Sequence, residues 1–435
     1  MTTPELLRLT TRIEERQAKV VVVGQGYVGL PLALRAAEVA FPVVGYDITP
    51  ARIDELRAGR SYIEDVTNEQ LVDALDAAYL PSCDADALAG FDIAIITVQT
   101  PLNEGTPDLS YIEAAGRHLA QFLQPGALVV LESTTYPGTT EELLRPILEA
   151  GGLRGETDFF IGYSPERIDP GNKVHTFVNT PKVVSGIGPN SLAAVEAFYG
   201  SLVDKVVPVA STATAELTKL LENTFRHVNI ALVNELAVFA RDLGVDIWSA
   251  IDAAGTKPYG FMRFTPGPGV GGHCLPIDPS YLAWRVERQL GHRFRFVELA
   301  NEVNRGMPEY VVHRVIALLN QEQRAVNGSQ ILLLGLAYKP GTSDWRESPA
   351  MLIAEQLARL GAIVRAHDEH VPMDARLGPP ITRVDCSVEE IKAADLVVLC
   401  VDHAELPYDD IAEHARLVLD TRGRLRGTNF RGETI

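Results

Sequence analysis

One cysteine of this chain stands in a setting that suits covalent chemistry. Cys274 follows the glycine-rich stretch Gly267–Gly272, and Asp278 comes four residues after it. Glycines let the backbone approach a ligand closely. A cysteine thiolate can attack an aldehyde to give a thiohemiacetal, which loses a hydride, becomes a thioester and releases an acid to water. The loop residues alone are equally compatible with a buried structural cysteine.

A lysine and an amide side chain form a second group with chemical use. Lys219 and Asn223 are four residues apart in a helical pattern, so they share one face of the helix. Together they could stabilise an oxyanion at a reacting carbon, and Asp278 could orient or deprotonate water. Taken alone, such a pair is more often part of a solvated helix face, and Asp278 would then be a helix cap.

The first glycine-rich loop predicts a dinucleotide site. Gly24–Gly29 reads G-x-G-x-x-G between an apolar run and a helical stretch, and Asp47 ends the next apolar run, 18 residues beyond Gly29. Gly24 permits the tight turn, Gly26 lets a pyrophosphate approach the backbone, and Gly29 allows close helix packing. The helix N-terminus offers N–H groups to the phosphates. A carboxylate at Asp47 suits ribose hydroxyls and repels a 2′-phosphate, which predicts NAD rather than NADP.

The elements that position these residues follow from the hydrophobic pattern. Apolar β-branched runs alternate with helical stretches over the first 210 residues, which predicts a doubly wound, parallel α/β sheet. Residues 1–19 lack the apolar stretch of a signal peptide and are expected to form a short surface helix. We expect a helix at 30–39 and strands at 19–24, 43–47, 93–98, 127–132 and 159–163.

A different pattern follows. Residues 213–243 contain no Gly or Pro and stop at Gly244, which predicts one helix about 45 Å long that links domains or packs on a partner subunit. A Gly/Pro-rich loop at 265–272 and a helical segment at about 279–304 come next.

A second α/β unit begins near Ser329 and resembles a degenerate copy of the first. Gly335 follows its first strand and Asp368 ends its second, but the glycine fingerprint is missing. Its first loop carries Lys339 and Arg346, so we expect it to bind a second, different nucleotide. Strands are predicted at 330–335, 362–368, 396–401 and 417–420, with a helix at 348–360.

Composition narrows the class of protein. A chain of 435 residues suggests two or three domains. The formal net charge of −18 argues against general affinity for nucleic acid or anionic lipid. No apolar run is long enough to span a bilayer, so we expect a cytoplasmic protein with no membrane partner. Neither a metal site nor a disulfide framework is expected, because the four cysteines show no metal-ligand spacing; apart from Cys274 they are Cys83, Cys386 and Cys400.

In their order along the chain, several motifs resemble those of the UDP-glucose/GDP-mannose dehydrogenase family. The resemblance runs from Val20 to about Thr421. A set of ordered motifs is far more specific than any single one. The motifs are Val22–Pro31, Thr97–Pro101, Glu132–Thr135, Ser164–Arg167, Glu216–Asn223, Gly267–Cys274 with Asp278, and Tyr338–Ser348.

The resemblance implies three domains: an NAD-binding Rossmann domain at 1–210, a central helical dimerisation domain at 211–325 and a Rossmann-like UDP-sugar domain at 326–435. It implies Cys274 as the nucleophile, surrounded by Lys219, Asn223 and Asp278, with Glu166 and Thr134 positioning water. Cofactor contacts are implied at Tyr27, Val28, Arg52, Thr100, Thr134 and Arg346, besides the three glycines and Asp47. Substrate contacts are implied at Glu166, Arg167, Lys219, Asn223, Arg263, Gly271, Tyr338 and Lys339.

Two stretches differ from the UDP-glucose enzymes and resemble the branch that acts on UDP-N-acetylhexosamines. They are Ser164–Asn172 and the pair His273-Cys274. The expected reaction is a four-electron oxidation at C6 of the sugar, for surface polysaccharides. We expect UDP-GlcNAc to be the preferred substrate, with UDP-ManNAc or UDP-glucose as alternatives, and a homodimer or higher homo-oligomer.

Two other functions compete with this one. A two-electron hydroxyacid dehydrogenase would share the first domain and the long helix, but has no use for Cys274 or the second α/β unit. A non-catalytic NAD-sensing module would explain Gly24–Gly29 alone. The NADH formed per substrate consumed separates the three functions, being about two, one or zero.

Overall fold

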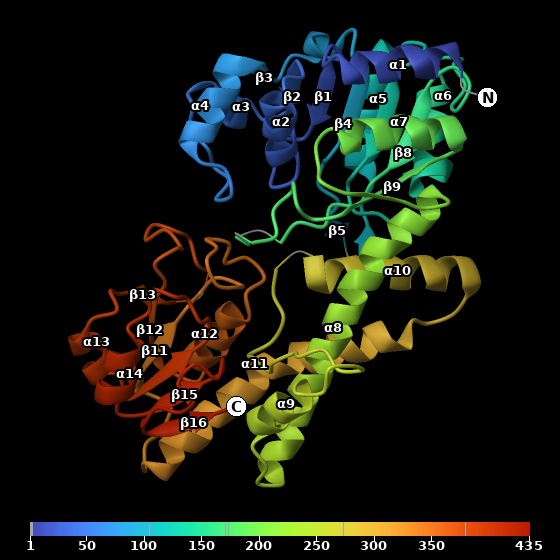
Figure 1. Cartoon of the computed structure of the whole chain (residues 1–435). Coiled ribbons are helices and arrows are strands. Elements are labelled where there is room, and N and C mark those ends of the chain that lie inside the picture. The colour runs from blue at the N-terminus through green and yellow to red at the C-terminus, as the bar shows by residue number, and fades with distance from the viewer. Residues whose placement is uncertain (1–2, 104, 170, 173, 273, 379) are drawn as a thin grey trace. The chain divides into compact units, whose positions relative to one another are not determined.

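The computed structural model describes residues 3–103, 105–169, 171–172, 174–272, 274–378 and 380–435. Its contacts divide the chain into two compact units (Figure 1). The first contains residues 1–222 and 280–291, and the second contains residues 223–279 and 292–435. Each unit is built around its own sheet, whereas the division into three domains stays a prediction.

The first unit contains an eight-stranded sheet in the order β10-β9-β8-β7-β4-β1-β2-β3. Its central strands are buried apolar runs, as predicted, because helices cover both faces of such a sheet. The strands are β1 (Val20–Val23), β2 (Val43–Tyr46), β3 (Tyr79–Ser82), β4 (Ile93–Ile96), β7 (Leu128–Leu131), β8 (Phe160–Tyr163), β9 (Lys182–Gly186) and β10 (Val206–Pro208).

The pair β8–β9 departs from the parallel sheet that the sequence predicts. These two strands run antiparallel, whereas all the other neighbours in this sheet, as far as the structure describes it, run parallel. The described residues between β8 and β9 form no helix. A parallel neighbour needs a crossover connection, usually a helix, so a strand without one returns in the opposite direction.

Helices flank this sheet (Figure 1). The N-terminal helix α1 was expected at the surface, but Leu6, Leu9 and Ile13 are buried in the core of the unit, so one of its faces packs inward. The helices are α1 (Pro4–Glu14), α2 (Gly29–Glu38), α3 (Pro50–Arg57), α4 (Asn68–Ala77), η1 (Ala85–Leu88), α5 (Ser110–Phe122), η2 (Thr140–Leu144), α6 (Arg145–Glu149) and α7 (Pro189–Gly200); β5 (Leu102–Asn103) and β6 (Thr106–Pro107) form a short hairpin.

The long helix is confirmed as α8 (Thr212–Asp242). It ends before Gly244, whose φ of +69° is a left-handed conformation that terminates helices. A short helix, α9 (Ile247–Gly255), follows.

The helical segment predicted at 279–304 is wrong as a single element. The structure has two helices there, α10 (Cys274–Leu290) and α11 (Arg295–Gln321). Gly291, with φ of +67°, ends α10, since glycine takes this conformation without the steric cost of a side chain.

The second unit contains a six-stranded parallel sheet in the order β13-β12-β11-β14-β15-β16. Val311, Val315 and Leu319 of α11 pack into its core with α12. Among the described residues, no helix is both long and apolar enough to cross a membrane. The elements are β11 (Gln330–Leu334), α12 (Pro349–Arg359), β12 (Ile363–His367), β13 (Thr382–Arg383), α13 (Val388–Ala393), β14 (Leu396–Leu399), α14 (Tyr408–His414), β15 (Val418–Asp420) and β16 (Gly432–Thr434).

Candidate active site

The loop between β1 and α2 has the shape that a dinucleotide requires. Gly24 has a φ of +99°, and a Cβ on Gly29 would lie 1.9 Å from the carbonyl oxygen of Gly24. Neither position accepts a side chain. A Cβ on Gly26 would meet no atom within 4 Å, so open space lies in front of this backbone. The loop therefore leaves room for a pyrophosphate against the chain.

The N-terminus of α2 borders the glycine loop, and the N–H of Leu30 donates a hydrogen bond of 3.1 Å to the carbonyl oxygen of Gly26. The N-cap residue is Val28, which provides no side-chain hydrogen bond to the first N–H groups of the helix. Such groups need an acceptor, and phosphate oxygens are suitable acceptors at a helix N-terminus. The exposed ring of Tyr27 belongs to the same loop. These residues fit the predicted NAD.

Asp47 is fixed in place directly after β2. Its Oδ2 accepts a hydrogen bond of 3.0 Å from the backbone N–H of Gln25, and its Oδ1 accepts one of 2.9 Å from Thr49. The half-exposed guanidinium of Arg52 lies 3.3 Å from Oδ2. The carboxylate thus connects the glycine loop with the start of α3.

Two predicted threonines lie in loops that follow strands of the same sheet. Thr100 follows β4, and its carbonyl oxygen accepts a hydrogen bond of 2.7 Å from Tyr281. Thr134 follows β7 and is half-buried. Because carboxyl ends of parallel strands meet at one sheet edge, both threonines belong to the edge that also carries Asp47.

Glu166 is buried and held by several donors. Its Oε1 accepts hydrogen bonds of 2.6 Å from the backbone N–H groups of Arg167 and Ile168. Its Oε2 lies 3.3 Å from Nζ of Lys182, and that ammonium lies 3.1 Å from Oε1 of Glu132. Burial lowers the pKa of Lys182, but the two carboxylates outweigh it and raise the pKa above its ordinary value.

This buried cluster was not predicted from the sequence. The hydroxyl of Tyr199 donates a hydrogen bond to Glu132. Burial raises the pKa of Glu132 and outweighs both this hydrogen bond and the attraction of Lys182, which lower it. The signal in the sequence was weak: Glu132 ends one apolar run, and Lys182 begins another. Charged residues beside buried strands are expected to be paired.

Arg167 extends this region toward the first turns of α8. Its guanidinium makes two hydrogen bonds, of 3.2 and 2.6 Å, to the carboxylate of Glu222, and a third of 2.6 Å to the carbonyl oxygen of Pro181. Arg167 is therefore already engaged by protein groups.

The amide and the aspartate of the predicted catalytic set are in direct contact. Nδ2 of Asn223 donates a hydrogen bond of 2.6 Å to Oδ2 of Asp278. Asp278 is the fifth residue of α10 and is buried, so it is not the helix cap that the alternative interpretation required. Lys219, one helical turn before Asn223 on α8, is half-buried rather than fully solvated.

Cys274 is the first residue of α10. Its side chain and the whole of His273 lie outside the described residues. The other cysteines are an exposed Cys83, a half-buried Cys386 and a buried Cys400. Burial raises the pKa of Cys386 to about 11, which leaves that thiol protonated.

In the second unit, the glycine loop before Cys274 packs against the loop after β11. A Cβ on Gly271 would lie 2.6 Å from the carbonyl oxygen of Glu347, and one on Gly272 would lie 2.7 Å from the ring of Tyr338. Nζ of Lys339 lies 5.9 Å from the centroid of that ring. Only glycine fits such a close approach, so these two loops are positioned together.

Two predicted arginines have partners among nearby acidic residues. Arg263 pairs with Asp252 of α9 at 2.9 Å, and both are exposed. Arg346 pairs with Asp344 at 2.8 Å. Their proposed contacts with substrate and cofactor stay predictions.

Three segments of the chain match the three domain models of one protein family. Residues 18–203, 213–306 and 332–427 match the NAD binding, central and UDP binding domains of the UDP-glucose/GDP-mannose dehydrogenase family. UDP-N-acetyl-D-mannosamine dehydrogenase of Pyrococcus horikoshii is 35% identical, over 95% of this chain and 98% of that protein. UDP-N-acetyl-D-glucosamine 6-dehydrogenase of Pseudomonas aeruginosa is 38% identical, over 90% of this chain and 92% of that protein. A solved structure of the Pyrococcus horikoshii UDP-D-ManNAc dehydrogenase superposes with a TM-score of 0.86 at 35% identity, covering 95% of this chain and 98% of the other.

Proposed function

Because this chain belongs to the UDP-glucose/GDP-mannose dehydrogenase family and is an NAD-dependent nucleotide-sugar dehydrogenase, we propose that it oxidises C6 of a UDP-N-acetylhexosamine to a carboxylate. The observation that carries the proposal is the match to relatives named for two such sugars. We propose UDP-GlcNAc as the preferred substrate and UDP-ManNAc as the second. The stretches Ser164–Asn172 and His273-Cys274 support an N-acetylated sugar over UDP-glucose.

Cys274 is the proposed covalent nucleophile. The C6 alcohol first loses a hydride and its hydroxyl proton to become an aldehyde. The thiolate then adds to the aldehyde carbon, and the new C–S bond places a hydride-donating carbon where the carbonyl was. Loss of the second hydride gives a thioester, and water breaks the C–S bond to release the acid and restore the thiol. Two NAD molecules, bound one after the other at Gly24–Gly29, would each accept one of the two hydrides.

The remaining residues stabilise charge and position water. We propose that Lys219 and Asn223 stabilise the negative oxygen on C6. The hydrogen bond from Asn223 to Asp278 fixes the orientation of the amide. Glu166 and Thr134 position the water that attacks the thioester, with Glu166 held by Lys182.

The experiment counts NADH. Wild-type protein should form about two NADH per sugar consumed, and Cys274→Ala should form no acid. Cys83→Ala is the matched control, since Cys83 is exposed and outside the predicted set, and it should behave as wild type. Acid formation by Cys274→Ala near the wild-type rate would show that the mechanism is wrong.

Two further measurements test the charge stabilisation and the substrate. Lys219→Ala and Asn223→Ala should each reduce turnover by about 100- to 1000-fold, whereas Asn229→Ala on the same helix should not. A panel of UDP-GlcNAc, UDP-ManNAc, UDP-GalNAc, UDP-glucose and GDP-mannose tests the sugar. A higher kcat/KM for UDP-glucose than for every N-acetylated sugar would reject the proposed substrate.

We also propose that the protein is a homodimer or higher homo-oligomer, through α8. Within the second unit, Leu232, Leu236 and Phe239 of α8 are exposed, and their spacing places them on one side of the helix. Sedimentation of Leu236→Glu should show dissociation. Leu352→Glu, at a comparably exposed leucine of α12, serves as the control, and equal assembly of both variants would contradict this interface.

A further inference from the structure

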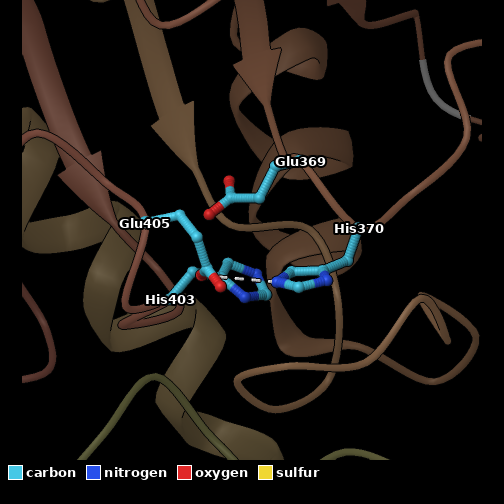
Figure 2. A group of neighbouring side chains, drawn as sticks. All are labelled: Glu369, His370, His403 and Glu405. Carbon is cyan, nitrogen blue, oxygen red and sulfur yellow. Dashed lines mark ion pairs between the residues drawn. The ribbon is translucent and has the colours of Figure 1, made fainter. Parts of the chain in front are cut away.

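Four side chains of the second unit converge beyond the carboxyl ends of two strands. Glu369 and His370 follow β12, and His403 and Glu405 follow β14 (Figure 2). One ligand atom from each residue lies within 4.8 Å of the ligand atoms of all the others. We propose that this cluster binds one divalent transition-metal cation of the zinc type.

The chemistry of the donors selects this class of cation. Two imidazoles and two carboxylates are ligands that zinc commonly takes in proteins, in a tetrahedral set of four. Magnesium and calcium prefer sites made only of oxygen ligands. The two carboxylates carry a charge of −2, which a divalent cation neutralises. Divalent cobalt suits the same ligands and serves as a spectroscopic probe of such a site.

His403 is prepared as a metal ligand. Its side chain is fully buried, and its Nε2 lies 3.1 Å from Oδ2 of Asp368. A carboxylate behind a histidine is the usual support of a metal-bound imidazole, because it fixes the ring and makes the other nitrogen a better donor. That other nitrogen, Nδ1, accepts a long hydrogen bond of 3.2 Å from the N–H of Gly341, which the cation would replace.

His370 presents a nitrogen that needs a partner. Its Nε2 is buried and makes no hydrogen bond within the part of the chain that the structure describes. The nearest acidic atom, Oε2 of Glu405, lies 3.5 Å away. The ring of His370 is tilted by 36° against that of His403, with 4.7 Å between centroids. Buried nitrogens are rarely left unsatisfied, and a cation in the plane of the His370 ring, beside Nε2, would satisfy this one.

Glu369 has one competing contact, since its Oε2 lies 3.3 Å from Nε2 of His367. The pairs His367–Glu369 and His370–Glu405 offer a simpler explanation of why these side chains lie together, in which the cluster consists only of weak histidine–glutamate pairs. Exposed pairs of this kind contribute little to stability. The two explanations differ in whether the protein takes up one cation with defined affinity.

The position of the cluster means that a bound cation would connect several loops of the second unit. β12 and β14 lie on either side of β11. Asp368 accepts hydrogen bonds from the N–H groups of Leu336 and Ala337, in the loop that follows β11. A cation at the cluster would therefore fasten three loops together, including the loop that carries Tyr338 and Lys339. Binding to the folded state alone also raises its stability.

The test uses full-length protein without an affinity tag, treated with a chelator and then titrated with Co²⁺. We expect one Co²⁺ per chain, visible d–d absorption without a thiolate charge-transfer band, and displacement by Zn²⁺. A rise in the unfolding temperature should accompany saturation. A thiolate band would place the cation on a cysteine and overturn the proposal, as would the absence of binding.

Variants locate the site. Loss of a residue that merely supports a ligand commonly weakens metal binding about 10- to 100-fold, so His370→Ala and Glu405→Gln should each weaken it at least about tenfold. His313→Ala, at an exposed histidine of α11, is the control and should bind as wild type. Circular dichroism establishes that each variant is folded, and Glu405→Gln preserves the shape of the side chain. Unchanged affinity in either cluster variant would overturn the assignment.

Discussion

The two sheets place an aspartate at the same point and surround it differently. Asp47 follows β2 and Asp368 follows β12, and each of these strands pairs with a strand that is followed by a glycine. Those glycines, Gly24 and Gly335, both have a positive φ, of +99° and +87°. Both aspartates are buried. The shared backbone therefore does not decide what the carboxylate does.

The hydrogen-bond donors around each carboxylate make the difference. Asp47 accepts two backbone N–H groups and faces the half-exposed Arg52. Asp368 accepts four backbone N–H groups and the ring of His403. Burial raises the pKa of Asp368, but hydrogen bonds from His403 and the backbone outweigh it and hold the pKa well below its ordinary value. The hydrogen bonds of Asp368 thus connect the loop after β11 with the loops after β12 and β14. Asp47, in contrast, is proposed to bind a ribose.

A third carboxylate shows that N–H donors alone do not keep a buried acid ionised. Glu216 accepts hydrogen bonds from the N–H groups of Gly138 and Thr140 and from the hydroxyl of Thr140. Burial nevertheless dominates and raises the pKa of Glu216 to about 7. Asp368 differs in having an imidazole beside it. The imidazole of His403, rather than the number of N–H donors, separates the two acids.

The largest effect is expected from Asp368→Asn. The substitution removes a buried charge that four N–H groups and the ring of His403 stabilise, and the loss of one partner from such a buried network costs about 3–5 kcal/mol. Denaturant unfolding of metal-free protein should show a loss of this size. Asp47→Asn should cost about 1 kcal/mol, because its cationic partner is half-exposed. Equal losses of unfolding free energy in the two variants would show that the two aspartates do not differ in their contribution to stability.

The next largest effect is the pH dependence of the unfolding free energy that is caused by Glu216. Because its folded-state pKa lies above the ordinary 4.5, the folded state holds a proton that the unfolded state has lost. Its contribution is fully present below pH 4.5 and disappears as the pH rises to about 7. At 1.36 kcal/mol per pKa unit, wild type should lose about 3 kcal/mol over this window relative to Glu216→Gln. If the unfolding free energies of wild type and Glu216→Gln changed equally with pH, this prediction would be contradicted.

A smaller effect concerns the buried ammonium of the first unit. Lys182→Met leaves Glu132 buried without its cation, which removes the attraction that lowers the pKa of Glu132. We expect kcat at pH 7 to fall by about tenfold, with the acidic limb of the pH–rate profile moving to higher pH. Lys182→Arg should restore most of the activity. A uniform decrease at all pH values would indicate a structural role alone.

The smallest effect is on cofactor choice. Asp47→Ala removes the carboxylate that repels a 2′-phosphate and should lower the preference for NAD over NADP, measured as the ratio of kcat/KM values, by about fivefold, the size of one hydrogen bond. Asp54→Ala, on α3, is a suitable control. Comparable activity of wild type with both cofactors would show that Asp47 does not select NAD.

Most helices and strands could be predicted from local patterns in the amino-acid sequence. The apolar runs of β1, β2, β4, β7 and β8 could be read directly, because a strand buried on both faces excludes polar side chains. The glycine fingerprint could be read because no side chain fits at Gly24 or Gly29. The long helix α8 could be read because it contains no Gly or Pro before Gly244. All of these signals lie within short stretches of the chain.

Only the tertiary structure decided which distant residues meet. The antiparallel return of β9 depends on its connection, since Lys182 begins an apolar run that would suit either direction. The contact between Asn223 of α8 and Asp278 of α10 joins two residues that are 55 positions apart along the chain. The cluster of Glu369, His370, His403 and Glu405 joins two loops on either side of β11. Sequence spacing carries no record of such contacts, because the order of strands in a sheet differs from their order along the chain.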